Sequence, residues 1–253
     1  MKLKTIILNT FKEAVRGKIF LIILGFAIVL LVASKVLIPL SLGEERKIIM
    51  DIGLGGISIF GILLAILIGC QLVYNELERK TIYFVLSKPV KRETFIIGKF
   101  LGLLLTLLVV VLILSIWFYI ILFWLTKLHP ISLLIAIFLS FLELIIVTAL
   151  SIFFSTFTSP TLAAIFTFFL FVIGRLASDI QLLASKIKEP ISHFFLQLVY
   201  YIIPNLSNFN VRGRVVHNEI ISHNHILFSV AYALIYTIIL LLLSCEIFKH
   251  KDL

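Results

Sequence analysis

The sequence predicts an all-α integral membrane protein whose six transmembrane helices form a single transmembrane domain over residues 1–253. Two observations carry this prediction. Hydrophobic residues make up 61% of the chain and its mean hydropathy is +1.19, whereas soluble domains contain about 45–50% apolar residues. These residues also gather in runs of about twenty, the length that an α-helix needs to cross a bilayer. Lipid is therefore the expected solvent of this chain.

The apolar runs give the expected positions of the six spans. They lie at residues 19–40, 52–74, 97–126, 131–154, 161–183 and 226–246. Each span is long enough to satisfy its backbone groups within its own helix, as hydrocarbon surroundings require. Residues 1–17 precede the first span, and their apolar residues recur at three-and-four spacing. We expect an amphipathic helix in the membrane interface there, and a basic tail that only follows the charge rule is the alternative.

The distribution of Lys and Arg predicts the orientation of the spans. With the N-terminus inside, the inner side holds Lys2, Lys4, Lys12, Arg16, Lys18, Arg79, Lys80, Lys88, Lys91, Arg92, Lys99, Lys249 and Lys251. The outer side holds fewer basic residues, namely Arg46, Lys47, Lys127, Lys186, Lys188, Arg212 and Arg214. The positive-inside rule then predicts a multi-pass protein of the cell (plasma) membrane with both termini in the cytoplasm. Because the basic residues lie at the ends of apolar segments, the net charge of +9 does not indicate a nucleic-acid partner.

Two segments outside the spans are long enough to have a specialised role. Residues 75–96 are expected in the cytoplasm, and residues 184–225 are expected outside. The external segment contains an apolar and aromatic stretch at 191–203, bounded by Pro190 and Pro204. Because this stretch is too short to cross a bilayer of about 30 Å, we expect external re-entrant or interfacial helices between spans five and six.

The cytoplasmic segment has the pattern of a short amphipathic helix followed by a break. Ile82, Val85 and Leu86 fall at helical three-and-four spacing. Pro89 disfavours helical geometry for Lys88 and can itself open the next helix. A short helix held between two spans is suited to passing movement to both of them.

An ordered set of residues accompanies this break. In chain order they are Glu76, Thr81, Leu86, Pro89, Arg92, Gly98 and Lys99. The pattern resembles the signature of ABC-2 type transporter permeases, the membrane-spanning subunits of ATP-binding-cassette (ABC) exporters. The resemblance extends over the whole chain and is closest to the nitrous-oxide-reductase-maturation and gliding-motility permeases, partly through residues 204–210. The alternative interpretation is a basic loop that only follows charge topology.

The resemblance implies a role for the cytoplasmic segment. In ABC-2 permeases this segment is the coupling helix, which docks in a groove of the ATP-binding subunit and passes its movement to the membrane helices. By resemblance, the contact with the ATPase would involve Glu76, Glu78, Arg79, Thr81, Leu86, Pro89 and Arg92. Residues 1–17 would be the elbow helix of this family.

The resemblance also implies partners. The sequence has no phosphate-binding loop of the GxxxxGK[ST] kind, since Gly98 and Lys99 lack the preceding glycine spacing and the following hydroxyl residue. We therefore expect this chain to bind no cofactor and to have no catalytic residues, with ATP and Mg held by a separate ABC ATPase subunit. Since the chain is about half of the membrane complement of a full transporter in this family, a dimer with a second copy or a homologue is expected.

Three ionisable residues fall inside the predicted spans. Glu143 lies near the middle of span four, where a charge costs about 2.5–3.5 kcal/mol on translocon scales. Arg175 lies in span five, and Asp179 follows one helical turn later, where it could neutralise Arg175 without Glu143. One hypothesis places these residues on a substrate pathway, and the other makes them a polar staple between helices.

The external segment contains a group of possible metal ligands. His217, Glu219, His223 and His225 lie close together in sequence, but their spacing matches no recognised ligand pattern. A solvated loop is the favoured interpretation, and we assign no metal site.

These observations favour energy-coupled movement of a substrate across or out of the membrane, with export as the expected direction. A membrane scaffold that anchors an ABC ATPase without transporting is a rival from another class. An intramembrane hydrolase is disfavoured, because Glu143 has no obvious catalytic partner at its depth.

Single-cysteine labelling in intact cells tests the predicted topology. A cysteine at position 212 should react with an impermeant reagent from outside, whereas one at position 91 should be protected, as the distribution of basic residues requires. Labelling of position 91 from outside, or protection of position 212, would refute the orientation.

Overall fold

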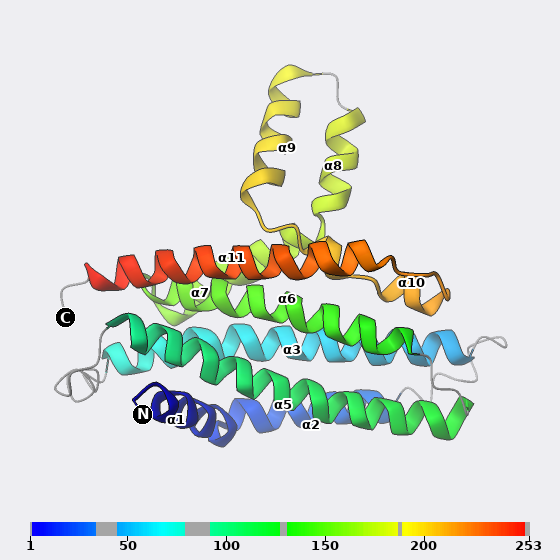
Figure 1. Ribbon diagram of the computed structural model, residues 1–253, viewed down its shortest axis with the longest axis horizontal. Helices are drawn as coiled ribbons and strands as arrows, with labels where there is room; N and C mark the ends of the chain where they lie inside the picture. The colour runs from blue at the N-terminus through cyan, green and yellow to red at the C-terminus, as the bar shows by residue number, and fades with distance from the viewer. Residues whose placement is uncertain (1, 34–44, 79–91, 127–130, 187–188, 251–253) are drawn as a thin grey trace.

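The computed structural model describes residues 2–33, 45–78, 92–126, 131–186 and 189–250. These residues form α-helices, one short 3-10 helix and connecting turns, and no strand occurs among them. The prediction of an all-α protein is confirmed. Both ends of the described chain lie at one end of an elongated bundle (Figure 1), which we call the N/C end.

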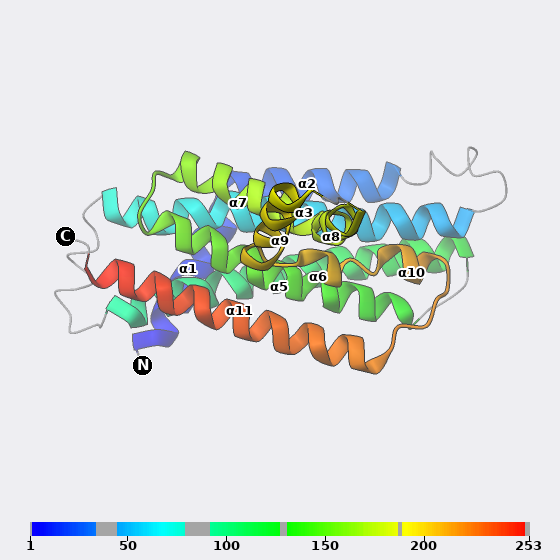
Figure 2. The same cartoon turned by 90° about the horizontal axis from the view of Figure 1, so that it is seen from above.

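The described residues form a series of helices along the chain. They are α1 (Lys2–Arg16), α2 (Lys18–Ala33), α3 (Glu45–Glu78), α5 (Arg92–Thr126), α6 (Ser132–Ser155), α7 (Pro160–Arg175), α8 (Ala177–Lys186), α9 (Pro190–Ile202), η2 (Leu206–Phe209), α10 (Arg212–Val216) and α11 (His223–Lys249). In Figure 1, α3, α5, α6 and α11 run along the length of the bundle. The hairpin of α8 and α9 stands away from it, and seen from above it lies over the middle of the bundle (Figure 2).

Among the described residues, four helices are long and apolar enough to cross a membrane: Arg46–Leu72 within α3, Arg92–Trp124 within α5, Ser132–Ser155 and His223–Lys249. α7 and α8 meet the same test together, but they are bent by 56° at their junction. Within this part of the chain there are therefore four candidate spans, or five with the bent pair. A crossing at 19–40 stays a prediction, since the described part of that segment, α2, ends at Ala33.

The predicted span over 161–183 is not one continuous helix, because α7 and α8 meet at a bend of 56°. The chain leaves helical geometry at Leu176, whose backbone has φ −88° and ψ 5°. Two residues earlier, a Cβ on Gly174 would lie 2.5 Å from the carbonyl oxygen of Pro204. Only glycine allows this close approach, so the end of α7 is held against the chain that returns from α9. Asp179 then falls in the first turn of α8, where an acidic residue is favourable.

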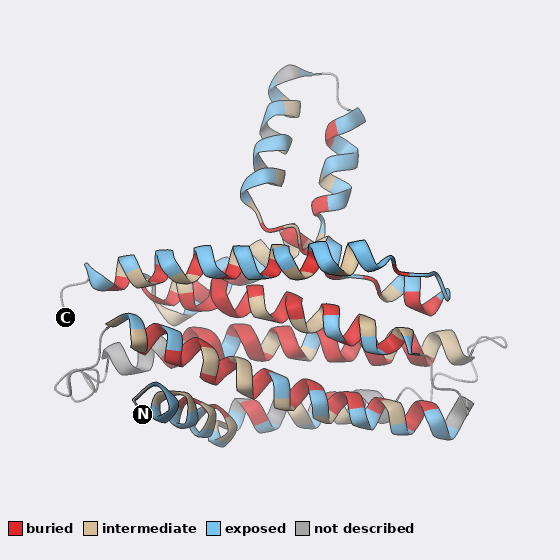
Figure 3. Ribbon diagram, in the orientation of Figure 1, coloured by how far each residue is buried: buried red, intermediate tan, exposed pale blue. Residues whose placement is uncertain are grey.

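Tight contact between α3 and α6 forms the centre of the bundle. A Cβ on Gly61 would lie 2.7 Å from Cδ1 of Leu144, and one on Gly69 would lie 2.9 Å from Cβ of Ser151. Small residues allow such close approach, which drives helix association in lipid. Buried residues dominate α3 and α6, whereas α11 exposes much of its length (Figure 3). In the apolar windows of α3 and α11, 72% and 22% of the residues are buried, so α3 is central and α11 peripheral.

Substitution of Gly69 by Ala tests this packing. The new methyl group meets Cβ of Ser151, which cannot move without its backbone, so we expect a loss of about 1–3 kcal/mol in the free energy of unfolding in mixed micelles. Gly25→Ala in α2 is the matched control, because nothing lies within 4 Å of its Cβ position, and it should stabilise slightly through helix propensity. Equal effects of the two substitutions would contradict the close contact.

Candidate functional site: a polar junction within the membrane domain

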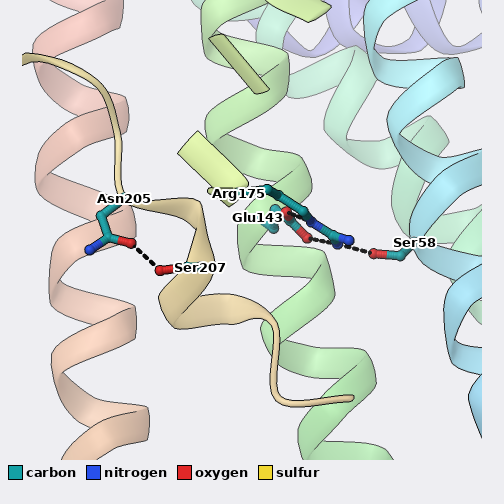
Figure 4. Close-up of polar contacts among 5 residues, drawn as sticks. All are labelled: Ser58, Glu143, Arg175, Asn205 and Ser207. Carbon is teal, nitrogen blue, oxygen red and sulfur yellow. Dashed lines mark hydrogen bonds and ion pairs between the residues drawn. The ribbon is translucent and has the colours of Figure 1, made fainter. Parts of the chain in front are cut away.

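A buried ion pair joins α6 to the end of α7. Nε of Arg175 lies 2.8 Å from Oε1 of Glu143, and Nη2 lies 2.8 Å from Oε2. The two parallel bonds form the bidentate geometry that makes Arg–carboxylate pairs strong and directional. Figure 4 shows the Arg175 guanidinium against the carboxylate. The Glu143 side chain is 1% exposed and that of Arg175 is 25% exposed, so this charge pair is largely removed from solvent.

The pair also reaches the third central helix. Nη2 of Arg175 donates a hydrogen bond of 2.8 Å to Oγ of Ser58 in α3, which is 5% exposed. The guanidinium carbon lies 5.3 Å from the centroid of the Phe171 ring, within the range of a cation–π contact. One guanidinium group thus connects α3, α6 and α7.

Geometry favours a structural role for this pair. Both carboxylate oxygens of Glu143 are occupied by Arg175, and the one hydroxyl that the guanidinium contacts accepts a hydrogen bond from it. Asp179, which the sequence offered as a nearby partner for Arg175, does not bind it in the structure. Asp179 lies beyond the bend, in α8, and is exposed. Because either charge alone inside the membrane would be costly, the pair resists separation of α6 from α7.

A second polar cluster fixes the chain that returns from the α8–α9 hairpin. The backbone N–H of Asn205 donates to the hydroxyl of Tyr232 in α11 at 2.8 Å, and its side-chain amide donates to the hydroxyl of Tyr200 at 3.3 Å. Ser207 donates to the side-chain oxygen of Asn205 (Figure 4) and shares a hydrogen bond of 2.6 Å with Ser178 at the start of α8. Both roots of the hairpin are therefore bound to the bundle.

An ion pair at the opposite end of the bundle continues this attachment. The guanidinium of Arg212 bonds both carboxylate oxygens of Asp51, with Nε–Oδ1 at 2.6 Å and Nη2–Oδ2 at 3.1 Å. A Cβ on Gly55 would lie 2.3 Å from Nη1 of Arg212, so a larger residue at position 55 would displace the guanidinium. Through this pair, α10 is bound to the start of α3.

Among the histidines near this end, His225 makes a described contact, and that contact is with the protein backbone. Nε2 of His225 lies 2.9 Å from the carbonyl oxygen of Asn208. No three His, Cys, Asp or Glu residues within the described ranges form a group that could hold a metal ion. His217, Glu219 and His223 are among these residues, and they form no such group.

The residues predicted from the family resemblance to contact the ATPase belong to the stretch from the last turns of α3 to the start of α5, at the N/C end. Arg79, Thr81, Leu86 and Pro89 lie outside the described residues. Glu76 and Glu78 lie in the last turns of α3, where the structure describes the backbone but not their side chains. Arg92 opens α5, and its Nη1 donates to the carbonyl oxygens of Phe248 at 3.3 Å and Lys249 at 2.9 Å. It thereby binds carbonyls that the end of α11 leaves without helical partners.

The Gly98–Lys99 pair fixes α1 to α5. A Cβ on Gly98 would lie 2.6 Å from Cγ2 of Ile6, and one on Gly102 would lie 2.5 Å from Cβ of Thr10. Nζ of Lys99 forms an ion pair of 3.2 Å with Glu13, and the Lys99 side chain is only 3% exposed. The start of α5 thus contacts both α1 and α11.

Several residues of these junctions were not singled out from sequence. Ser58, Gly174 and Glu13 each depend on a partner distant in the chain, and none belongs to a local motif. Asn205 lies in the stretch 204–210, but the sequence assigned it no contact. Ser58 is a polar residue within a long apolar run, and this could have marked it as a hydrogen-bonding partner. Serine is common in membrane helices, however, so its presence alone did not indicate a role.

Two substitutions of Glu143 separate charge from bonding. Glu143→Gln keeps one oxygen acceptor for Arg175 but removes the negative charge and one of the two bonds, so it should lose less stability than Glu143→Leu. Glu143→Leu leaves a largely buried guanidinium without its carboxylate, which should cost about 3–5 kcal/mol in the free energy of unfolding in micelles. Glu219→Leu at an exposed position is the control. If both Glu143 variants unfold like the parent, the ion pair does not hold the bundle together.

Comparison with known proteins places these features in a family. No curated protein matches the sequence. A family model described as "ABC-2 family transporter protein" matches residues 4–253, so it covers the ion pair, the hairpin and both bundle ends. The prediction of an ABC-2 type permease is confirmed at the level of this family, while the closer subgroup stays a prediction. The chain belongs to the ABC-2 family of transporter proteins.

Proposed function

We propose that this chain is the permease subunit of an ABC exporter and is driven by a separate ATPase subunit. The family match over residues 4–253 carries the proposal. ATP and Mg would be bound by the ATPase, and this chain would supply the membrane path and the surface on which the ATPase acts. The positive-inside rule assigns the N/C end to the cytoplasm, where the ATPase would lie.

The contacts at the N/C end support a coupling role for the segment that joins α3 to α5. Any displacement of that segment acts directly on the last turn of α3 and on the first turn of α5. Arg92 passes the displacement to the end of α11, and Lys99 passes it to Glu13 of α1. Two further helices, α11 and α1, therefore respond to movement of one segment.

The mid-bundle ion pair determines how this movement spreads. Since the Arg175 guanidinium binds α3 and α6 together at the end of α7, these helices should move as one body. Movement at the N/C end would then reach the α8–α9 hairpin, because these helices would not slide past one another. In this proposal Glu143 and Arg175 are positioning residues that transmit movement and make no contact with substrate.

The exposed face of α11 is compatible with assembly with a second permease subunit. α11 presents large apolar side chains such as Phe228, Ile235 and Leu242, which are 74%, 60% and 65% exposed. Lipid covers such a face as well as protein does, so the support comes from the family, whose transporters have two membrane subunits. The second subunit is a copy of this chain or a homologue.

Charge reversal at Glu76 and Glu78 tests the ATPase contact. We expect the Glu76→Lys and Glu78→Lys double variant to lose the co-purified ATPase in detergent, because like charges across a partly desolvated contact cost several kcal/mol. The permease itself should elute unchanged in gel filtration, because the exchanged side chains lie at the end of α3, beyond its apolar span.

The matched control reverses Glu44 and Glu45, the second of which begins α3, and it should retain the ATPase. Full retention of the ATPase by the Glu76 and Glu78 variant, together with substrate-stimulated hydrolysis, would contradict the coupling assignment. Retention of the ATPase by the parent without any stimulation of hydrolysis by transported compounds would instead favour a scaffold that anchors the ATPase.

A further inference from the structure

A cleft lies where the joint between α1 and α2 meets α3, near the N/C end. Its volume is about 340 Å³, and its walls include Gly17 and Lys18 at the joint and Gln71 and Leu72 on α3. This volume falls within the about 300–1,000 Å³ typical of sites for small organic ligands. The cleft is separate from the mid-bundle ion pair and from the segment proposed to contact the ATPase.

The cleft is amphipathic. Ala14, Phe20 and Leu72 form an apolar floor and are buried in the bundle. Lys18 and Gln71 stand at its rim, and both are exposed. A molecule that fits this surface must therefore have an apolar part and a polar head group.

The charges at the rim select the sign of that head group. Glu13 is the acidic residue of the lining, and its carboxylate is bound to Nζ of Lys99 at 3.2 Å. Lys18 has no ion-pair partner among the described residues, and the exposed Lys12 and Arg16 precede it on α1. The available charge at the cleft is positive, so the fitting head group is an anion.

The position of the cleft along the bundle indicates where such a molecule comes from. The apolar run of α3 gives way to Asn75 and Glu76 about one helical turn after Leu72, so Gln71 and Leu72 lie near the level where hydrocarbon gives way to lipid head groups. At this level Lys18 can extend toward the head-group layer while its methylene chain stays on apolar surface. A lipid of the adjacent leaflet reaches this cleft without leaving the membrane.

We propose that the cleft binds one anionic phospholipid from the leaflet at the N/C end. Its phosphate interacts with Lys18 and Gln71, and the first part of an acyl chain lies on Phe20 and Leu72. The bound lipid fills the space between the α1–α2 joint and α3, and it stabilises the joint beside the Lys99–Glu13 ion pair. This site does not depend on the proposed transport function.

The test is lipid selectivity measured by electron paramagnetic resonance. The purified full-length chain is placed in phosphatidylcholine vesicles that contain a trace of spin-labelled lipid. We expect spin-labelled phosphatidylglycerol to associate about fivefold more strongly than spin-labelled phosphatidylcholine, because one basic residue near an anionic head group contributes about 1 kcal/mol, and a factor of ten corresponds to 1.4 kcal/mol. Lys18→Gln should remove this preference. Gln71→Trp, which fills the mouth of the cleft without changing its charge, should remove it as well.

Arg214→Gln is the matched control, since it removes an exposed basic residue near the opposite end of the bundle, and it should keep the preference. Circular dichroism checks that every variant is folded. The proposal is overturned if the parent shows no preference for phosphatidylglycerol, or if either cleft variant retains it. It is also overturned if an excess of soluble glycerol phosphate displaces the lipid, since the site would then recognise a phosphate ester and not a membrane lipid. Loss of the ATPase from Lys18→Gln with the lipid preference intact would assign the cleft to a protein partner.

Discussion

The ion pair between Glu143 and Arg175 is the interaction on which the arrangement of the membrane domain depends. Burial of either charge alone would be unfavourable, and the bidentate bond at 2.8 Å makes each residue the partner of the other. Because Arg175 ends α7, this bond fixes the place where the chain leaves the bundle and forms the α8–α9 hairpin. Through Ser58 the same guanidinium also binds α3. Removal of the pair would therefore loosen three helices and the root of the hairpin together.

The other polar contacts extend this constraint along the bundle. At the N/C end, Arg92 and Lys99 bind the start of α5 to α11 and α1. At the opposite end, Arg212 binds α10 to α3. Between these ends, α3 and α6 are in close contact through glycine positions. A rigid centre with polar attachments at both ends is suited to carry movement along its length, which is the property that a permease driven by a separate ATPase requires.

The sequence was sufficient to predict an all-α membrane protein and an ABC-2 permease, because long apolar runs and the ordered residues from Glu76 to Lys99 are local signals. It was not sufficient to predict the break at Leu176. Residues 161–183 form one continuous run by hydropathy, whereas the close approach of Gly174 to Pro204 that accompanies the break joins positions far apart in the chain. The charge at Glu143 was recognisable as costly, but sequence could not decide between Asp179 and Glu143 as the partner of Arg175. Local spacing favours Asp179, whereas the structure brings Glu143 to the guanidinium from 32 residues away.

A double-substitution cycle at Glu143 and Arg175 tests the central claim most directly. The free energy of unfolding is measured in mixed micelles for the parent, Glu143→Leu, Arg175→Met and the double variant. If the two side chains hold the bundle as a pair, the double variant should lose less stability than the sum of the single variants, with a coupling of about 0.5–3 kcal/mol. The single variants should each leave a buried charge and lose more than the double variant does. Additive losses would contradict the account, because they would mean that Glu143 and Arg175 act independently and that their bond does not hold α6 and α7 together.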